Sequence, residues 1–320
     1  MAACFGSIAA SSTGFGQSRS TRRRVGALVA SSEALAAPFL AALKRGMREL
    51  GWQEGKDIEY RFVYANGAVE RYDALIADLL AQRVEVILVT STQAVQAAQR
   101  ATQTVPIVMT SVAGAVAAGL VESLARPGGN VTGLSNQFED VLPKVIETLH
   151  AIVPGVQRVA VLLQATASLN PQLWAVAQTT CDALGIEAIR DLANSVMDFK
   201  EAATRIVRRR AQAVVVSPDA TFWAERTKLQ EAMQSTQLPV AYGWREQAVV
   251  GGLFSYGVSL TAVFHHAATY VDKTLRGAKP ASLPIEQPTK FELVINLKTA
   301  RALGIRIPQS VLLRADEVID

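Results

Sequence analysis

Small polar side chains follow several predicted strands of this sequence, and they have the chemistry to bind a small solute. Together with two aromatic residues and one aspartate, they are Ser31, Ser32, Ser91, Thr92, Ser111, Ser135, Asn136, Gln164, Thr166, Asp219, Tyr242 and Trp244. In an open parallel sheet, ligands bind outside the carboxyl ends of the strands. Hydroxyl and amide groups there can hold a polar molecule, and helix N-termini favour a carboxylate on it. The alternative is that each serine or threonine only caps the helix that follows.

The sequence offers little that would support catalysis. His265 and His266 are adjacent in a predicted helix, where neighbouring side chains point about 100° apart, so a two-ligand metal site is not expected. No Gly-x-Ser-x-Gly elbow, Walker A loop or Gly-x-Gly-x-x-Gly turn occurs. Asp219 could be a general base, but it has no evident partner, so we expect it to contact a ligand ammonium or to cap a helix. The sequence thus predicts a protein that is not an enzyme and has no metal and no cofactor.

The composition favours two compact α/β lobes. A chain of 320 residues exceeds the usual size of one hydrophobic core, so two lobes of about 100 to 200 residues are expected. Half of the residues are hydrophobic and 19% are charged, which excludes a mainly disordered chain. The net charge of +4 is compatible with nucleic acid, but the arginine runs at 22–24 and 208–210 form no long stripe. We therefore expect solvated surface runs and no nucleic-acid partner.

The N-terminus and the cysteines say little about the compartment. Cys4 and Cys181 are the only cysteines, so neither a disulfide framework nor a metal cluster is predicted. No apolar run reaches the roughly 18 residues needed to span a bilayer. A short arginine run followed by apolar residues imitates a signal peptide, but residues 31–33 interrupt it. We predict that residues 25–30 form the first core strand and that residues 1–21 are a leader remnant or disordered.

Strands and helices alternate along the first part of the chain. Apolar runs predict strands at 25–29, 58–63, 84–89 and 106–109. Apolar residues at helical spacing predict helices between them, the first opened by Pro38 and ended by Gly51. The continuous run at 84–89 is typical of a strand buried on both faces. This alternation predicts a parallel, doubly wound sheet.

The same order begins again in the second part of the chain. Strands are predicted at 158–163, 186–190 and 213–216, with helices at 171–184 and 198–209. The spacing from Ile58 to Val86 equals the spacing from Ile186 to Val214. This pseudo-repeat indicates two similar lobes rather than one long sheet.

The stretch from Ala125 to Asn136 joins the two parts. Its Pro-Gly-Gly-Asn run ends the preceding helix near Arg126, and a short strand follows at 131–134. We expect this strand to lead into the second lobe, with Ser135 and Asn136 at the edge of a cleft between the lobes.

The C-terminal part is predicted to cross between the lobes again. It holds a strand at 253–256 that returns to the first lobe, a helix at 260–276, a proline-rich connector at 279–288, a strand at 291–296 and a helix at 297–303. We therefore assign residues 22–135 and 253–278 to the first lobe. Residues 136–252 and 279–320 are assigned to the second.

Five motifs occur in the order found in a known family. They are Gly46-Met-Arg-Glu-Leu-Gly-Trp52, Leu120-Val-Glu-Ser-Leu-Ala-Arg-Pro-Gly-Gly-Asn-Val-Thr-Gly133, Ala241-Tyr-Gly-Trp-Arg-Glu246, Gly251-Gly-Leu-Phe-Ser-Tyr-Gly257 and Phe291-Glu-Leu-Val-Ile-Asn-Leu-Lys-Thr-Ala300. From about residue 24 to its end, the sequence resembles the ABC transporter substrate-binding proteins, a family that includes binders of tryptophan and other aromatic amino acids. The resemblance implies a type I periplasmic binding fold, in which two doubly wound parallel-sheet lobes are joined by a three-crossover hinge.

The resemblance also implies a function and a set of site residues. The protein would be the periplasmic solute-binding component of an ABC uptake transporter, capturing a small carboxylate, such as an amino acid or an aromatic acid, by hinge closure. It would deliver this ligand to a membrane permease, and we expect it to be a monomer. Cleft positions of the family are similar to Ser32, Ser91, Thr92, Ser111, Ser135, Asn136, Gln164, Thr166, Asp219, Tyr242 and Tyr256.

One departure from the family concerns the ligand. Where many relatives have Gly-Asp-Pro-Val, this chain has Gly114-Ala-Val-Ala117, so an ammonium group loses one carboxylate partner. A hydroxyl-lined rim with Tyr242, Trp244 and Tyr256 fits an aromatic or other small carboxylate. The alternatives are a ligand-sensing binding protein for a membrane receptor and, with less support, a soluble α/β enzyme.

Overall fold

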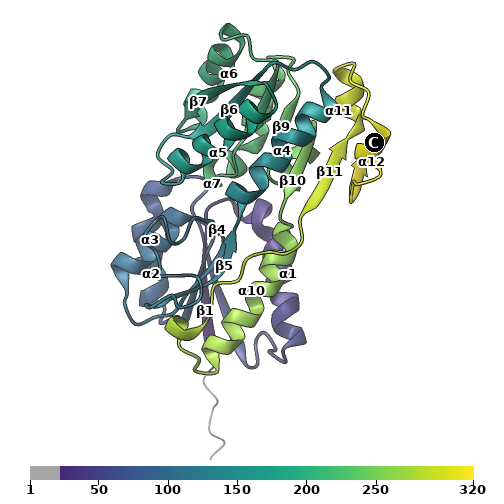
Figure 1. The fold of residues 1–320 in the computed structure, drawn as a ribbon. Coiled ribbons are helices and arrows are strands. Elements are labelled where there is room, and N and C mark those ends of the chain that lie inside the picture. The colour runs from purple at the N-terminus through teal and green to yellow at the C-terminus, as the bar shows by residue number, and fades with distance from the viewer. Residues whose placement is uncertain (1–21) are drawn as a thin grey trace, which may run out of the picture.

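Two α/β lobes, each built on its own sheet, make up the protein (Figure 1). The arrangement is seen in a computed structural model, which describes residues 22–320. The predictions for residues 1–21, Cys4 included, lie outside the described residues. The two-lobed, largely parallel fold class predicted from the sequence is confirmed.

The first lobe contains a parallel sheet in the order β2-β1-β3-β4-β5. Its strands are β1 (Arg23–Val29), β2 (Ile58–Tyr64), β3 (Val86–Val89), β4 (Ile107–Ala113) and β5 (Val131–Asn136). Its helices are α1 (Glu33–Glu49), η1 (Val69–Arg71), α2 (Tyr72–Ala81), α3 (Thr92–Ala101), α10 (Leu260–Leu275) and η3 (Pro280–Ser282). The four residues of β3 are all buried, as the apolar run predicts for a strand covered on both faces.

The second lobe repeats this order and extends it. Its sheet runs β12-β11-β10-β9-β8-β6-β7, and only the pair β10 and β11 is antiparallel. The strands are β6 (Arg158–Gln164), β7 (Glu187–Ala193), β8 (Ala213–Val216), β9 (Val240–Tyr242), β10 (Phe254–Gly257), β11 (Glu292–Asn296) and β12 (Glu317–Ile319). The helices are α4 (Phe138–Ile152), α5 (Asn170–Ala183), η2 (Val196–Asp198), α6 (Phe199–Arg208), α7 (Ala220–Ala224), α8 (Arg226–Gln234), α9 (Arg245–Val249), α11 (Leu297–Ala302) and α12 (Gln309–Leu312). The order β7-β6-β8-β9-β10 matches β2-β1-β3-β4-β5, so the pseudo-repeat in the sequence corresponds to two similar lobes.

The chain passes between the lobes three times. It crosses from β5 to α4, from β10 to α10, and from the segment after η3 to β11 (Figure 1). Before the third crossing, Leu283 accepts a hydrogen bond from the Thr132 hydroxyl at 2.8 Å, and Glu286 accepts one from the Ser135 amide at 2.9 Å. This segment therefore extends the first sheet beside β5.

Two parts of the expected domain division were wrong. The strand Phe254–Gly257, which we assigned to the first lobe, pairs with β9 and β11 in the second sheet, so the crossing follows the strand instead of preceding it. The stretch from Pro280 to Glu286, which we assigned to the second lobe, packs on β5 of the first. A short apolar run or a proline-rich connector does not specify which sheet edge it joins, because partner strands far along the chain decide this.

The start of α1 also differs from the prediction. The helix begins at Glu33, and Pro38 lies inside it. The extended backbone of Ser32 and the acidic Glu33 in the first turn mark the N-terminus, where a negative charge is favoured by the helix dipole. Pro38 alone was therefore a misleading start signal.

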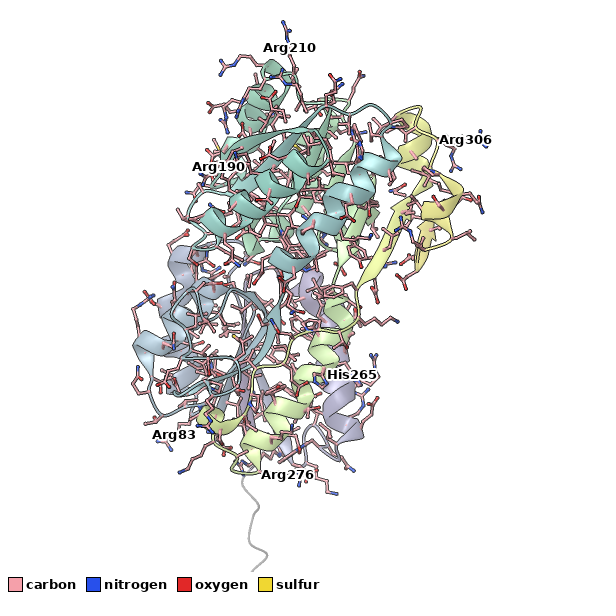
Figure 2. The ribbon with its side chains drawn as sticks, in the orientation of Figure 1. Arg83, Arg190, Arg210, His265, Arg276 and Arg306 are labelled. Carbon is pink, nitrogen blue, oxygen red and sulfur yellow. The ribbon has the colours of Figure 1, made fainter. Side chains whose placement is uncertain are left out.

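Charged side chains project from the outer surfaces of both lobes (Figure 2). The labelled residues Arg83 and Arg276 lie at the far end of the first lobe, and Arg190 and Arg210 lie on the second. The adjacent histidines pair with different carboxylates: His265 lies 2.8 Å from Glu49, and His266 lies 2.6 Å from Glu286.

Two further observations concern residues 22–320. Within them, no group of three or more His, Cys, Asp or Glu side chains is placed to hold a metal ion. Over the same range, no helix combines the length and the apolar character needed to span a membrane.

Candidate functional site

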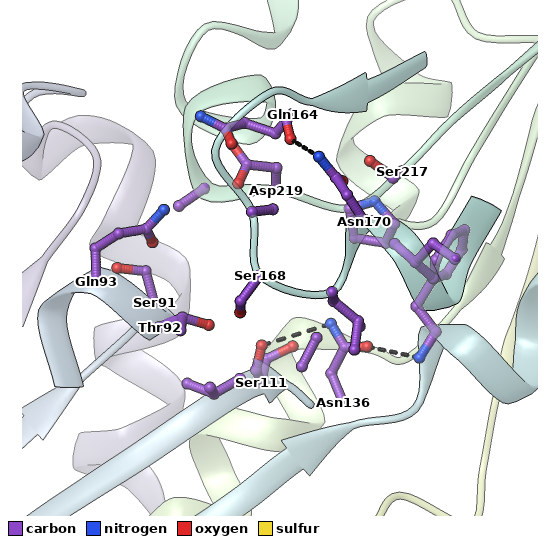
Figure 3. Close-up of a pocket in the computed structure, with 18 of the residues that line it drawn as sticks. Ser91, Thr92, Gln93, Ser111, Asn136, Gln164, Ser168, Asn170, Ser217 and Asp219 are labelled. Atoms are coloured by element: carbon purple, nitrogen blue, oxygen red, sulfur yellow. Dashed lines mark hydrogen bonds between the residues drawn. The ribbon is translucent and has the colours of Figure 1, made fainter. Parts of the chain in front are cut away.

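A polar cavity lies between the lobes, at the carboxyl ends of strands from both sheets (Figure 3). Its volume is about 110 Å³, well above the roughly 10 to 15 Å³ that one water molecule requires. Of the predicted site residues, Ser91, Thr92, Ser111, Asn136, Gln164, Thr166, Asp219 and Trp244 line it. The cavity is therefore large enough for a small organic ligand.

The first lobe contributes the N-terminus of α3. The Ser91 hydroxyl oxygen accepts the Ala94 amide at 3.2 Å, so Ser91 caps this ten-residue helix, and the capping alternative holds for it. Thr92 and Gln93 in the first turn also line the cavity. Amides of a first helical turn have no intrahelical partner, which makes this wall suitable for an anionic group.

Ser111 lies at a strained bulge within β4. The register between β4 and β5 shifts between Met109 and Val112, as in a β-bulge, and the backbone of Ser111 has φ of 53°. This left-handed conformation is costly for a residue with a Cβ. Its buried hydroxyl has no hydrogen-bond partner within the described residues. Backbone strain of this kind is often retained where it positions a functional group.

We expect Ser111→Gly to separate stability from binding. Glycine relieves the left-handed strain, so the free protein should become more stable by about 1 kcal/mol, while ligand affinity falls because the hydroxyl is lost. Ser111→Ala removes the hydroxyl but keeps the strain, and it should lose affinity without gaining stability. Urea unfolding and calorimetric titration of both variants test this. Equal stability of the two variants would contradict the strain assignment.

Asn136 and Ser135 follow one another at the first crossover. The Asn136 side chain accepts a hydrogen bond from the Phe138 amide at 2.8 Å and donates one to the Ser111 carbonyl at 3.5 Å (Figure 3). The second bond joins β5 to the strained bulge in β4. The Ser135 hydroxyl instead donates to the Val112 carbonyl at 3.0 Å and does not line the cavity. Alternation along β5 places these neighbours on opposite faces.

The second lobe contributes a network around Gln164. Its amide oxygen accepts the amide and the hydroxyl of Thr166 at 2.7 and 3.1 Å, and its amide nitrogen donates to Asn194 at 3.0 Å. Asn170 donates to the Gln164 carbonyl, which leaves the buried Asn170 Oδ1 without a partner within the described residues (Figure 3). This wall therefore presents an unused hydrogen-bond acceptor.

Asp219 is the sole charged side chain among the described residues that line the cavity. Its Oδ1 accepts the amides of Thr221 and Phe222 at 2.7 and 3.3 Å, so it caps α7, as one of the two sequence interpretations predicted. The carboxyl group is open to the cavity but surrounded by protein. Burial raises its pKa above the ordinary value, and the capping amides lower it in part.

Five predicted site residues do not line the cavity. Tyr242 is buried in the second lobe, where its hydroxyl donates to Gln230 at 2.7 Å. Tyr256 packs beside Phe291 with ring centroids 6.2 Å apart. Ser135 and Ser32 are likewise absent from the lining, and Ser31 lines a smaller apolar chamber next to it. For the tyrosines, the strands could be predicted from the sequence, but the face of the sheet on which each ring lies could not.

Several lining residues were not predicted. Gln93 lies one residue after the predicted Thr92, and Ser168 and Asn170 follow Thr166 in the loop before α5. The hydroxyl and amide residues that follow Gln164 could have indicated this loop. Residues 167–170 of this loop line the cavity together with Thr166.

The lobes touch each other around the cavity. The rings of Phe39 on α1 and Trp223 on α7 meet edge to face, with centroids 5.5 Å apart. Gly114 in the first lobe lies so close to Leu169 in the second that a Cβ on it would come within 2.6 Å of the leucine Cδ1. The residues that depart from the family, 115–117, therefore directly follow a contact between the lobes.

Residues 29–319 match the family described as ABC transporter substrate binding protein. The chain belongs to this family. A tyrosine-binding protein of Clostridioides difficile is 22% identical to this substrate-binding protein over 84% of the chain and 78% of the relative.

Solved structures share the fold of this substrate-binding protein. A conserved domain protein from Vibrio cholerae has a TM-score of 0.85 and 26% identity, covering 92% of this chain and 99% of that one. An ABC domain from Streptococcus pneumonia in complex with L-Trp has a TM-score of 0.85 and 24% identity, covering 93% and 100%. The fold is thus that of the type I periplasmic binding proteins, and the family binds substrates rather than transforming them.

Proposed function

We propose that this protein captures an amino acid between its lobes and delivers it to the permease of an ABC importer. The observation that carries the proposal is the charge pattern of the cavity, in which Asp219 is the sole charged side chain among the described lining residues. A ligand with one ammonium group fits this carboxylate, whereas a simple carboxylic acid would meet an uncompensated negative charge. Relatives that bind tyrosine and L-Trp support the amino-acid class.

The two ends of the ligand contact different lobes. The ammonium group lies with Asp219 and the free Asn170 Oδ1 of the second lobe. The carboxylate lies with Thr92, Gln93 and the first-turn amides of α3, near the Ser111 hydroxyl of the first lobe. Since both lobes are needed to satisfy both charges, the ligand stabilises the closed arrangement by hinge motion about the three crossovers.

The remaining parts of the proposal follow from the family. Its members are typically extracellular or periplasmic, so we place this protein in the periplasm, where it meets the permease. A titration of purified protein with the twenty amino acids by calorimetry tests the binding function. Saturable binding with one ligand per chain is expected for at least one of them, and binding of none would contradict the proposal.

Affinity should depend on pH through Asp219. Because burial raises the pKa of this carboxyl, the free protein holds it protonated at pH values where an exposed aspartate is already ionised. Below this raised pKa, binding of an ammonium group requires loss of a proton, so affinity falls by up to about tenfold per pH unit. Calorimetry from neutral to acidic pH measures this decline.

The stability of the free protein has the opposite pH dependence. A raised pKa means that the contribution of Asp219 to stability is present below its unfolded-state pKa and is lost as pH rises through the folded-state value. Asp219→Asn should remove both effects. A wild-type affinity that does not change between neutral and acidic pH would contradict the placement of the ammonium group at Asp219.

A further inference from the structure

An apolar chamber adjoins the polar cavity. The two share Thr90, Ser111, Ala220 and Trp244 as lining residues, so the chamber lies directly beside the cavity. Four aromatic side chains surround the chamber: Phe39, Phe264, Trp223 and Trp244. Their rings give it an apolar character that the polar cavity lacks.

The chamber is assembled from both lobes. Most of its lining comes from the first lobe, including Ala36 and Phe39 of α1 and Phe264 of α10, and the second lobe covers it with Trp223 and Trp244. The contact between Phe39 and Trp223 closes one side. A group held here is therefore enclosed when the lobes are together.

Two of the hydroxyl groups that line the chamber donate to backbone carbonyls, whereas the Ser111 hydroxyl has no partner within the described residues. The Thr110 hydroxyl donates to the Val89 carbonyl at 3.2 Å, and the Ser31 hydroxyl donates to the Ser32 carbonyl at 3.4 Å. The unpartnered Ser111 hydroxyl lines both spaces, so it lies where the chamber meets the polar cavity.

The size of the chamber limits the group that it can hold. Its volume is about 50 Å³, one third of the roughly 150 Å³ of a protein cavity that holds benzene. An aromatic ring is too large for it without separation of the lobes. A branched aliphatic group of three or four carbons is a better match.

We propose that the ligand is an amino acid with a branched aliphatic side chain, of the valine, leucine or isoleucine type, an inference that rests on the proposed function. Its ammonium and carboxylate groups occupy the polar cavity, and its side chain fills the apolar chamber. The chamber thus selects against aromatic amino acids by size.

Calorimetric titration with alanine, valine, leucine, isoleucine, phenylalanine, tyrosine and tryptophan tests this selectivity. Leucine should bind the wild-type protein roughly 50-fold more tightly than alanine, since it buries three more carbon atoms. The three aromatic amino acids should bind at least tenfold more weakly than leucine, because their rings exceed the space. Phenylalanine, tyrosine or tryptophan binding as tightly as leucine would overturn the inference.

A matched pair of variants locates the selectivity. Ala36 is buried and lines the chamber, whereas Ala37 is exposed on the same helix. Ala36→Leu fills the chamber and should abolish the preference for leucine over alanine, while Ala37→Leu should keep it. If Ala36→Leu does not fold, Ala220→Val is the alternative: Ala220 lines both spaces, so the larger side chain should reduce the same preference.

The outcomes separate the inference from the proposed function. Tight binding of aromatic amino acids, or an unchanged leucine preference in the folded Ala36→Leu or Ala220→Val variant, overturns the chamber assignment and leaves amino-acid binding in place. Binding of no amino acid by the folded wild-type protein overturns both.

Discussion

Replacement of Asp219 by asparagine is expected to weaken amino-acid binding by roughly 10- to 100-fold. The estimate corresponds to the loss of one charge-assisted hydrogen bond in a partly buried site. Asparagine caps helices about as well as aspartate, so α7 should keep its N-terminal cap. The free variant should therefore unfold within about 2 °C of the wild-type protein, or slightly above it because a buried charge is removed.

A ligand without the amino group provides the control. The deaminated analogue of the best ligand has no ammonium to lose, so it should bind Asp219→Asn at least as well as it binds the wild-type protein. Comparison of the two ligands on the two proteins isolates the interaction between ammonium and carboxylate. Equal losses for both ligands would show that Asp219 acts only as a helix cap.

Replacement of Gly133 by alanine should be among the most destabilising single changes near the hinge. Gly133 lies in β5 and pairs with Met109 of β4. Its φ is 126°, a backbone conformation that residues with a Cβ rarely adopt. A Cβ there would lie 2.2 Å from the Met109 carbonyl oxygen and 2.8 Å from its amide nitrogen, and backbone atoms cannot move aside as a flexible side chain can. Strain and overpacking together should cost about 3 kcal/mol or more in unfolding free energy.

Gly129 in the same motif is the matched control. A Cβ at this position meets nothing within 4 Å. Gly129→Ala should change stability by less than about 1 kcal/mol, and reduced freedom of the unfolded chain favours a small gain. Urea denaturation of both variants measures the difference. Similar urea midpoints for Gly133→Ala and Gly129→Ala would contradict the expected clash between a Cβ at residue 133 and the Met109 backbone.

Most of the fold could be predicted from local pattern. Continuous apolar runs such as the one in β3 and helical spacing in segments such as α10 depend on neighbours along the chain, and the repeat of this order indicated two lobes. Assignment of β10 to a lobe failed because its partners, β9 and β11, are selected by tertiary pairing. A strand of four residues contains no information about that choice.

The candidate site could be predicted in part for a similar reason. The rule that ligands bind at the carboxyl ends of parallel strands located Thr92, Ser111 and Asp219 correctly on the cavity. It could not decide whether Tyr242 faces the cavity or the helices, because one residue along a strand reverses the side on which the ring lies. The chamber under Trp223 was not foreseeable, since it forms only where the two lobes meet.

A crystal structure of the protein with its tightest-binding amino acid tests most directly how the ligand is held. We expect one ligand between the lobes, with its ammonium within hydrogen-bond distance of Asp219 and its carboxylate at the N-terminus of α3. A ligand bound outside this cavity, or bound with its carboxylate towards Asp219, would contradict it.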